Sequence, residues 1–150
     1  MILEVPHKAE RAMVRRMWKS YPCEYIEAIL GRRRRNRASV AVFYPINHTS
    51  DRTTTFAADD PHIDPRRHYE EDMYESARDE AADLGFDLLG MIHSHPGYNT
   101  CQHMSESDTE SFMDAHVIIE GIVHIFRCRQ QKHDTVCYHS PFEPVKVHYI

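Results

Sequence analysis

The segment His93-Ser94-His95-Pro96 constrains this chain more than any other, because it directly follows the apolar residues 86–92. The apolar run predicts a buried strand. Side chains alternate between the two faces of a strand, so His93 and His95 lie on one face at its end. Pro96 lacks a backbone donor and helps to end the strand there. The pattern therefore presents two imidazoles on one side of a sheet, where they could bind a metal.

A second segment, Ser105-Glu106-Ser107-Asp108, could supply a third metal ligand. Ser105 suits the N-cap of a helix predicted over residues 105–114, and Asp108 then lies in its first turn. A helix N-terminus favours a carboxylate, so Asp108 would be ionised. Two imidazoles and one carboxylate suit a catalytic zinc site, whose fourth position stays open for water. In the alternative interpretation, the histidines are incidental and Ser105 with Asp108 only caps the helix.

A hydrolytic zinc site also needs a carboxylate that takes a proton from water and gives it to the leaving group. The chain holds 23 Asp and Glu residues, so composition alone does not identify this group. Glu24 stands out because it follows Pro22 at the start of an apolar strand predicted over residues 24–30. Glu27 and several acids in the helices compete with it.

The rest of the pattern predicts an α/β fold, with a mixed sheet flanked by helices, as a single domain over residues 1–150. An Arg-rich turn, Arg32 to Arg37, is expected to join two strands as a hairpin. Residues 45–65 are expected to be mostly connection. Helices are predicted over residues 7–20, 66–83 and 105–114, and strands over residues 24–30, 38–44, 53–56, 86–93, 117–126, 136–139 and 145–149, with a polar turn at 130–134.

The composition excludes several classes of protein. With 41% hydrophobic and 27% charged residues, the chain has the balance of a soluble globular protein. A net charge of -5 argues against a nucleic-acid partner. The sequence shows no signal-peptide pattern and no apolar run that could span a bilayer, so we expect a cytoplasmic protein with no membrane partner. Its four cysteines form no CxxC pair and are expected to be free thiols.

These motifs make the chain resemble the JAMM/MPN+ (JAB-type) zinc metalloprotease family from about residue 1 to residue 126. The family pattern is a glutamate near the start of a strand, then His-Ser/Thr-His-Pro, then Ser-x-x-Asp. The resemblance implies a JAB/MPN-type, cytidine-deaminase-like architecture. It also implies an isopeptidase or peptidase that cleaves at the C-terminal tail of ubiquitin or a ubiquitin-like protein.

The resemblance also implies a role for each matched residue. His93, His95 and Asp108 would bind one zinc ion per chain. Glu24 would be the general acid/base, and Ser105 would donate a hydrogen bond to the oxyanion. The loop between His95 and Ser105 is about two residues longer than the family's common spacing, so Ser107 is the alternative to Ser105.

Three residues of that loop invite further interpretation. Tyr98 could border a substrate groove. Cys101 or His103 could occupy the open zinc position in a resting state, although a plain exposed loop is the simpler interpretation. The turn from Arg32 to Arg37 is either a solvated turn or a site for an anionic partner.

Other functions stay open beside the isopeptidase. The long insertion by which eukaryotic deubiquitinases of this family grip their substrate is not evident, so the modifier is unspecified. A peptidase that processes a sulfur-carrier protein is one alternative, and a non-catalytic MPN-like binding or scaffold module is another. A zinc deaminase would share the chemistry of zinc, water and glutamate, but its H-x-E and P-C-x-x-C signatures are absent.

Overall fold

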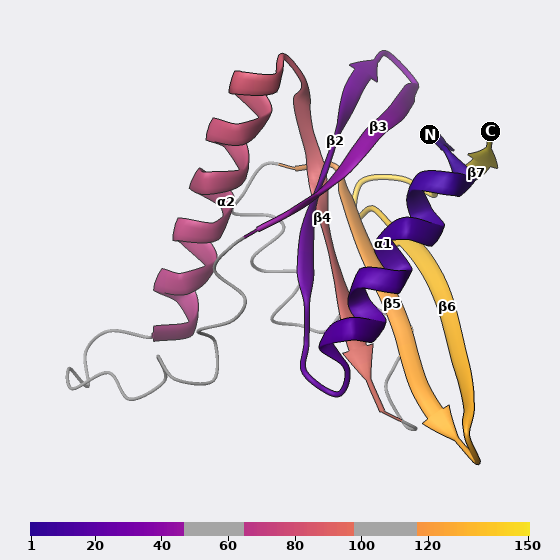
Figure 1. The fold of residues 1–150 in the computed structure, drawn as a ribbon. Helices are drawn as coiled ribbons and strands as arrows, with labels where there is room; N and C mark the ends of the chain where they lie inside the picture. The colour runs from indigo at the N-terminus through magenta and orange to yellow at the C-terminus, as the bar shows by residue number, and fades with distance from the viewer. Residues whose placement is uncertain (47–64, 98–116) are drawn as a thin grey trace.

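The computed structural model describes residues 1–46, 65–97 and 117–150 of the chain. In this part of the chain, one seven-stranded mixed sheet is flanked by two helices (Figure 1). The elements are β1 (Ile2–Val5), α1 (His7–Ser20), β2 (Ile26–Arg34), β3 (Arg37–Pro45), α2 (Pro65–Leu84), β4 (Asp87–Pro96), β5 (Ile119–Cys128), β6 (Gln131–His139) and β7 (Lys146–Tyr149). The predicted α/β class is confirmed.

β4 lies inside the sheet, whose strand order is β6-β5-β4-β2-β3-β1-β7. It runs antiparallel to β2 and parallel to β5. A strand that is covered on both faces carries a continuous apolar run instead of an alternating one, which explains the sequence before His93. Neighbours on both sides therefore fix the carboxyl end of β4, where the two histidines lie. This end and the turn of the β2–β3 hairpin lie at opposite ends of the sheet (Figure 1).

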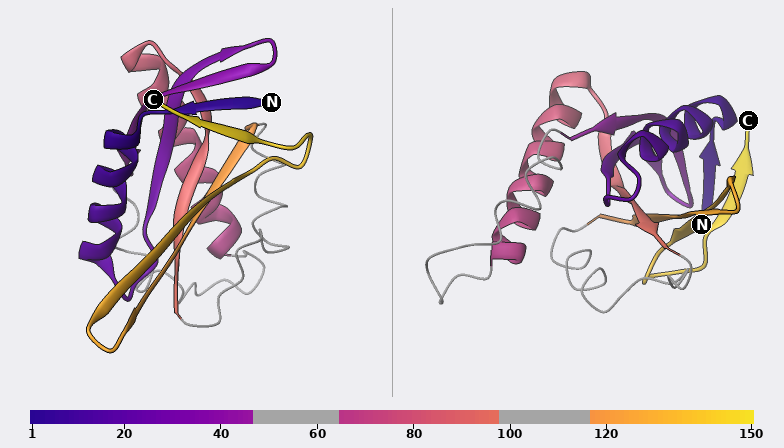
Figure 2. Two further views of the ribbon diagram at one scale, coloured as in Figure 1. Left: turned by 90° about the vertical axis from the view of Figure 1, so that its right-hand side faces the viewer. Right: turned by 60° about the horizontal axis from the view of Figure 1, so that its bottom comes forward.

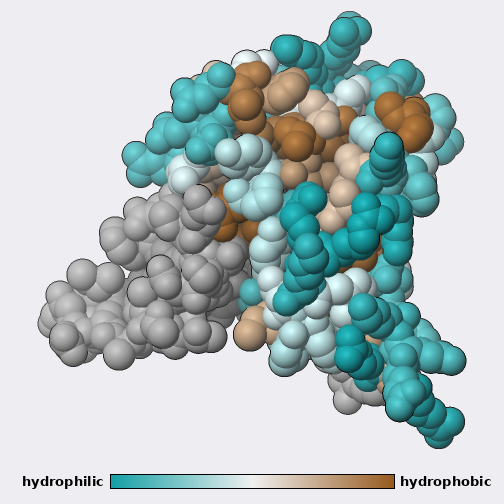
Figure 3. Space-filling view, in the orientation of Figure 1, coloured by the Kyte–Doolittle hydropathy of each residue, from teal (hydrophilic) through white to brown (hydrophobic). Residues whose placement is uncertain are grey.

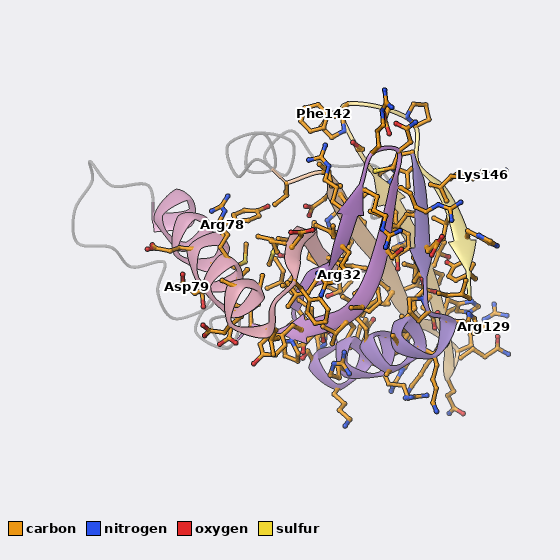
Figure 4. The ribbon with its side chains drawn as sticks, turned by 90° about the horizontal axis from the view of Figure 1, so that it is seen from above. Arg32, Arg78, Asp79, Arg129, Phe142 and Lys146 are labelled. Carbon is orange, nitrogen blue, oxygen red and sulfur yellow. The ribbon has the colours of Figure 1, made fainter. Side chains whose placement is uncertain are left out.

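The two helices cover opposite faces of the sheet (Figure 2). Met13 and Met17 of α1 are buried in one hydrophobic cluster, and Ala77 of α2 is buried in the other. In each helix the buried residues recur three or four positions apart, which gathers them on one side. The other side of α2 carries exposed charges, such as those of Arg78 and Asp79 (Figure 4).

The β2–β3 hairpin exists as predicted, but its bounds differ from the prediction. β2 begins at Ile26 and continues through Arg34, so the basic turn expected at Arg32 to Arg37 is wrong in extent. The turn consists of Arg35 and Asn36. Paired strands tolerate the arginines because their side chains are exposed while their backbones bond across the hairpin.

The polar turn predicted at residues 130–134 was also wrong, because β6 begins at Gln131. The turn is made by Arg129 and Gln130, whose φ angles of 48° and 66° suit a two-residue hairpin loop. β6 is an edge strand, so polar side chains remain compatible with its pairing. The projecting end of this β5–β6 hairpin is hydrophilic at its surface (Figure 3).

Some elements escaped prediction or lie outside the described residues. β1 was not predicted, because its parallel partners β3 and β7 are distant in sequence. The strand expected at 53–56 and the helix at 105–114 lie outside the described residues.

Cys23, Cys128 and Cys137 are free thiols, as expected. In residues 1–46, 65–97 and 117–150, no helix has both the length and the apolar character to cross a membrane.

Candidate metal centre

Two histidines face each other at the carboxyl end of β4. Nε2 of His93 lies 2.8 Å from Nε2 of His95, and the ring centroids are 4.7 Å apart. His93 is buried and His95 is half-buried. Strand alternation places both imidazoles on the same face. Two ring nitrogens, both of which could be metal ligands, thus converge at one point near the edge of the core.

A zinc ion fits these two nitrogens in chemistry and, after a small movement, in spacing. Zn–N bonds of about 2.05 Å at a tetrahedral angle separate two ligand nitrogens by about 3.3 Å. The observed separation of 2.8 Å is a hydrogen-bonding distance, so a movement of about 0.5 Å would let both nitrogens bind one ion. Side-chain rotation at the end of a strand can provide a movement of that size.

Ser94 ties the end of β4 to the residue that precedes β2. The backbone N–H of Tyr25 donates to Ser94 Oγ at 2.9 Å, and the backbone N–H of Ser94 donates to the Tyr25 carbonyl at 2.9 Å. These bonds lie next to Ile26 and His93, the pair at which the antiparallel pairing of β2 with β4 ends. Glu24 is the next residue before Tyr25. The sequence before β2 is thereby held at the histidine end of the sheet.

Glu24 and Glu27, the two candidate bases near β2, have different environments. Glu24 is exposed and lies in the connection between α1 and β2. Glu27 is fully buried, and its two oxygens accept hydrogen bonds from Arg16 at 2.7 and 2.8 Å. Because that guanidinium neutralises Glu27, the carboxylate is not available for proton transfer. Of the two, Glu24 is the exposed candidate, and it directly precedes Tyr25, which is bonded to Ser94 between the histidines.

A carboxylate that the sequence reasoning missed contacts His93 from β5. Glu120 Oε1 lies 2.8 Å from His93 Nδ1, and the two side chains are 4% and 7% exposed. His93 pairs with Ile122, and Glu120 lies two residues earlier on the same face of the parallel strand. The available signal was an acid inside an apolar run. Its partner could not be named without the register of β5 against β4.

His124 is a second residue that the sequence reasoning missed. It lies beside His95 in the parallel pairing of β4 with β5. Its Nε2 is 2.9 Å from the carbonyl oxygen of Gly97, so Nε2 carries the proton and donates. The Gly97 N–H in turn donates to the Ile125 carbonyl at 3.0 Å. Together these bonds fix the path of the chain just after Pro96.

The other predicted site residues lie outside the described residues. This holds for Ser105, its alternative Ser107, and Asp108, as well as for Tyr98, Cys101 and His103. Within the part of the chain that the structure describes, no group of three His, Cys, Asp or Glu side chains is arranged to hold a metal ion. The third ligand therefore stays a prediction from the sequence.

The family of the chain follows from a comparison with known domains. Residues 6–140 match the family model described as prokaryotic homologues of the JAB domain. The chain belongs to this family. The matched range spans the positions of Glu24, both histidines and Asp108. The predicted JAB-type family and fold are thus confirmed.

Solved structures agree with this JAB-domain fold. The solution structure of protein DSY2949 from Desulfitobacterium hafniense has a TM-score of 0.55 at 20% identity, covering 100% of this chain and 94% of that one. The crystal structure of AF2198, a JAB1/MPN domain protein from Archaeoglobus fulgidus, has a TM-score of 0.52 at 13% identity, covering 98% of each chain. No curated protein matches the sequence.

Proposed function

We propose that this JAB-domain protein is a zinc-dependent isopeptidase or peptidase that cleaves at the C-terminal tail of ubiquitin or a ubiquitin-like protein. The observation that carries the proposal is the convergence of two Nε2 atoms, from His93 and His95, at 2.8 Å on one strand face. The JAB/MPN family includes hydrolases, which is consistent with a catalytic site there. One zinc ion per chain would be held by these two histidines and Asp108.

The residues of the chain divide the proposed chemistry among them. When bound, zinc would polarise the scissile carbonyl and lower the pKa of a water molecule. Glu24 would take a proton from that water and deliver it to the leaving amine. Ser105 would donate a hydrogen bond to the developing oxyanion. Because no covalent acyl-enzyme is required, the cysteines need not act as nucleophiles.

The substrate would be a protein with an extended C-terminal tail. Such a tail can be bound as an added strand through backbone hydrogen bonds. Ubiquitin-like modifiers and sulfur-carrier proteins share this tail chemistry, so a cleavage screen should include both.

The first prediction concerns Glu24. The purified protein should contain about one zinc ion per chain, and Glu24→Gln should keep the zinc, because Glu24 is assigned to proton transfer. Cleavage of a ubiquitin-like fusion should fall by about 10²–10⁴-fold, the usual contribution of general acid/base catalysis. Metal analysis and a fusion-cleavage assay measure the two effects. Glu75→Gln, at an exposed position on α2, is the matched control and should change neither.

The outcomes separate the proposal from its alternatives. Loss of zinc in Glu24→Gln, or unchanged cleavage, would contradict the role of Glu24. Asp108→Ala should lower zinc affinity, and full retention of zinc would remove Asp108 from the site. A protein that binds zinc and its modifier but cleaves no fusion from either class would instead be a binding module.

A further inference from the structure

Glu120 is a carboxylate buried inside the sheet, on the face that carries the two histidines. Its side chain is 4% exposed, and that of His93 is 7% exposed. A buried carboxylate is costly unless hydrogen bonds or opposite charge compensate it. The contact of 2.8 Å between Glu120 Oε1 and His93 Nδ1 provides such compensation. The burial of Glu120 costs free energy, so its contact with one of the two converging imidazoles points to a chemical role.

The contact determines which nitrogen of His93 carries a proton. An ionised carboxylate can only accept a hydrogen bond, so Nδ1 of His93 must be the donor. In a neutral imidazole, the lone pair is then on Nε2. Nε2 is the atom that faces His95. Glu120 thus leaves His93 with its lone pair directed at the point where the two histidines converge.

The position of Glu120 follows from the register of two parallel strands. β5 pairs with β4 so that Ile122 lies beside His93 and Glu120 beside Met91. Glu120 therefore reaches His93 diagonally, from behind the ring, on the side away from Nε2. Metal-binding histidines almost always donate their second ring N–H to a carboxylate, carbonyl or water placed in this way.

We infer that Glu120 is a positioning residue for the metal centre: it holds His93 in the Nδ1–H tautomer and aims its Nε2 at the ion. The inference rests on the proposed function, because it needs a metal at the two histidines. Glu120 acts through His93 and contacts neither substrate nor reacting atoms. Its effect should therefore appear first in metal affinity and imidazole tautomer, and only through them in activity.

Zinc affinity is the first test, measured by chelator competition on folded protein. Loss of such a second-layer hydrogen bond typically weakens metal binding by about 10–100-fold. Glu120→Gln keeps the size of the side chain, but it removes the charge and lets the amide donate to Nδ1, which favours the wrong tautomer. We expect Glu120→Gln and Glu120→Ala to weaken zinc binding by about that factor. Glu120→Asp, a shorter carboxylate, should recover part of it.

Glu10→Gln is the matched control. Glu10 is also a buried carboxylate, but its partners are Tyr138 and Tyr149. A general effect of removing a buried charge would lower zinc affinity in Glu10→Gln and Glu120→Gln alike. We expect the affinity of Glu10→Gln to equal that of the wild-type protein, and an equal loss in both variants would overturn the inference.

A second measurement does not depend on the folding of any Glu120 variant. Nitrogen NMR of the wild-type protein, with His93 assigned by His93→Gln, reports which ring nitrogen is protonated. The inference requires protonated Nδ1 and unprotonated Nε2 in the metal-free protein, because zinc at Nε2 would itself exclude a proton from that nitrogen. Protonated Nε2 in the metal-free protein, or zinc affinity unchanged in Glu120→Gln, overturns the inference without contradicting the zinc site. If the wild-type protein binds no zinc, the proposed function and this inference both fail.

Discussion

At the scale of single residues, the ion pair between Arg16 and Glu27 joins α1 to β2. Glu27 is fully buried, and both of its oxygens accept from the guanidinium. The hydrogen bond from Arg16 to Glu27 raises the pKa of the guanidinium. Burial, together with a hydrogen bond to Glu27, also raises the pKa of Tyr25. Glu27 thus contacts both Arg16 of α1 and Tyr25, the residue that follows Glu24 in the connection between α1 and β2.

Arg16→Met tests the contribution of this pair to stability. The substitution keeps most of the side-chain length but leaves Glu27 as a buried charge without its cation. Loss of one partner from a fully buried pair costs about 3–5 kcal/mol. Because Arg16 is 33% exposed, solvent will compensate part of this, and we expect a loss of about 2–4 kcal/mol. Urea unfolding followed by circular dichroism measures the change.

The control for Arg16 is its exposed neighbour. Arg15→Met should leave the free energy of unfolding within about 0.5 kcal/mol of wild type. The double variant Arg16→Met/Glu27→Met should recover much of the stability, since it removes the buried charge together with its partner. Equal effects of Arg15→Met and Arg16→Met would contradict the structural role of the pair.

Single-residue patterns predicted one part of the site and missed another. His93 and His95 lie within one strand, so the alternation of side chains sufficed to bring them together. Glu24 and Glu27 could not be separated in the same way, because the difference between them is the presence of Arg16, eleven positions away. From the sequence, nothing distinguished Glu120 from the other 22 acids, and only the register of β5 against β4 shows its partner, His93.

At the scale of elements, the close pairing of β4 with β5 depends on two glycines. A Cβ on Gly90 would collide with the backbone carbonyl of Ile119, its partner in β5. A Cβ on Gly121 would come within 2.6 Å of the Ile92 side chain. A side chain can rotate, whereas a paired strand has to move. Gly90 is therefore the more sensitive position for the register that brings Glu120 to His93.

Gly90→Ala should move β5 away from β4. Overpacking of a core costs about 1–3 kcal/mol, and we expect Gly90→Ala at or above the upper end, with Gly121→Ala below it. Thermal unfolding compares the two variants. Because Gly90→Ala also disturbs the contact between Glu120 and His93, its zinc affinity should fall further than that of Gly121→Ala. The reverse order in stability and affinity would show that β5 tolerates the shift.

The elements with their own periodicity were predicted best. α1 has the predicted bounds, residues 7–20, because its apolar residues recur at helical spacing. The predicted strand at 136–139 began too late, because the first residues of β6 are polar. In the structure Asp134 accepts from Arg11 of α1, so a polar residue is placed by tertiary contacts. β1 is short and pairs only with distant strands, so local sequence holds no signal for it.

At the scale of the whole molecule, the sheet wraps around α1. β6 and β7 are the two outermost strands of the sheet. Yet Tyr138 of β6 and Tyr149 of β7 both donate to Oε2 of Glu10 on α1, at 2.8 and 3.0 Å. One buried carboxylate thus links both edges of the sheet to the same helix. The C-terminus lies at this junction, where Ile150 donates to the Val5 carbonyl and accepts from the N–H of His7.

The family resemblance predicted the overall architecture, but it did not predict that both edges of the sheet contact α1. The resemblance implied a JAB/MPN-type mixed sheet flanked by helices, which the structure confirms. The junction needs residues 10, 138 and 149 to meet, and their separation in sequence hides that contact. Long-range pairing of polar side chains is where sequence patterns carry the least information.

The junction predicts how stability changes at alkaline pH. Burial, with the charge of Glu10, raises the pKa of Tyr149 to about 12, compared with about 10 in an unfolded chain. Between these values the unfolded chain loses the proton first, so stability is full below about pH 10 and falls toward pH 12. Tyr149→Phe removes this group, and its free energy of unfolding should fall less steeply. Burial raises the pKa of Tyr138 too, so part of the slope should remain. Urea unfolding across this range measures both slopes, and parallel curves would rule out Tyr149 as a source of the alkaline loss.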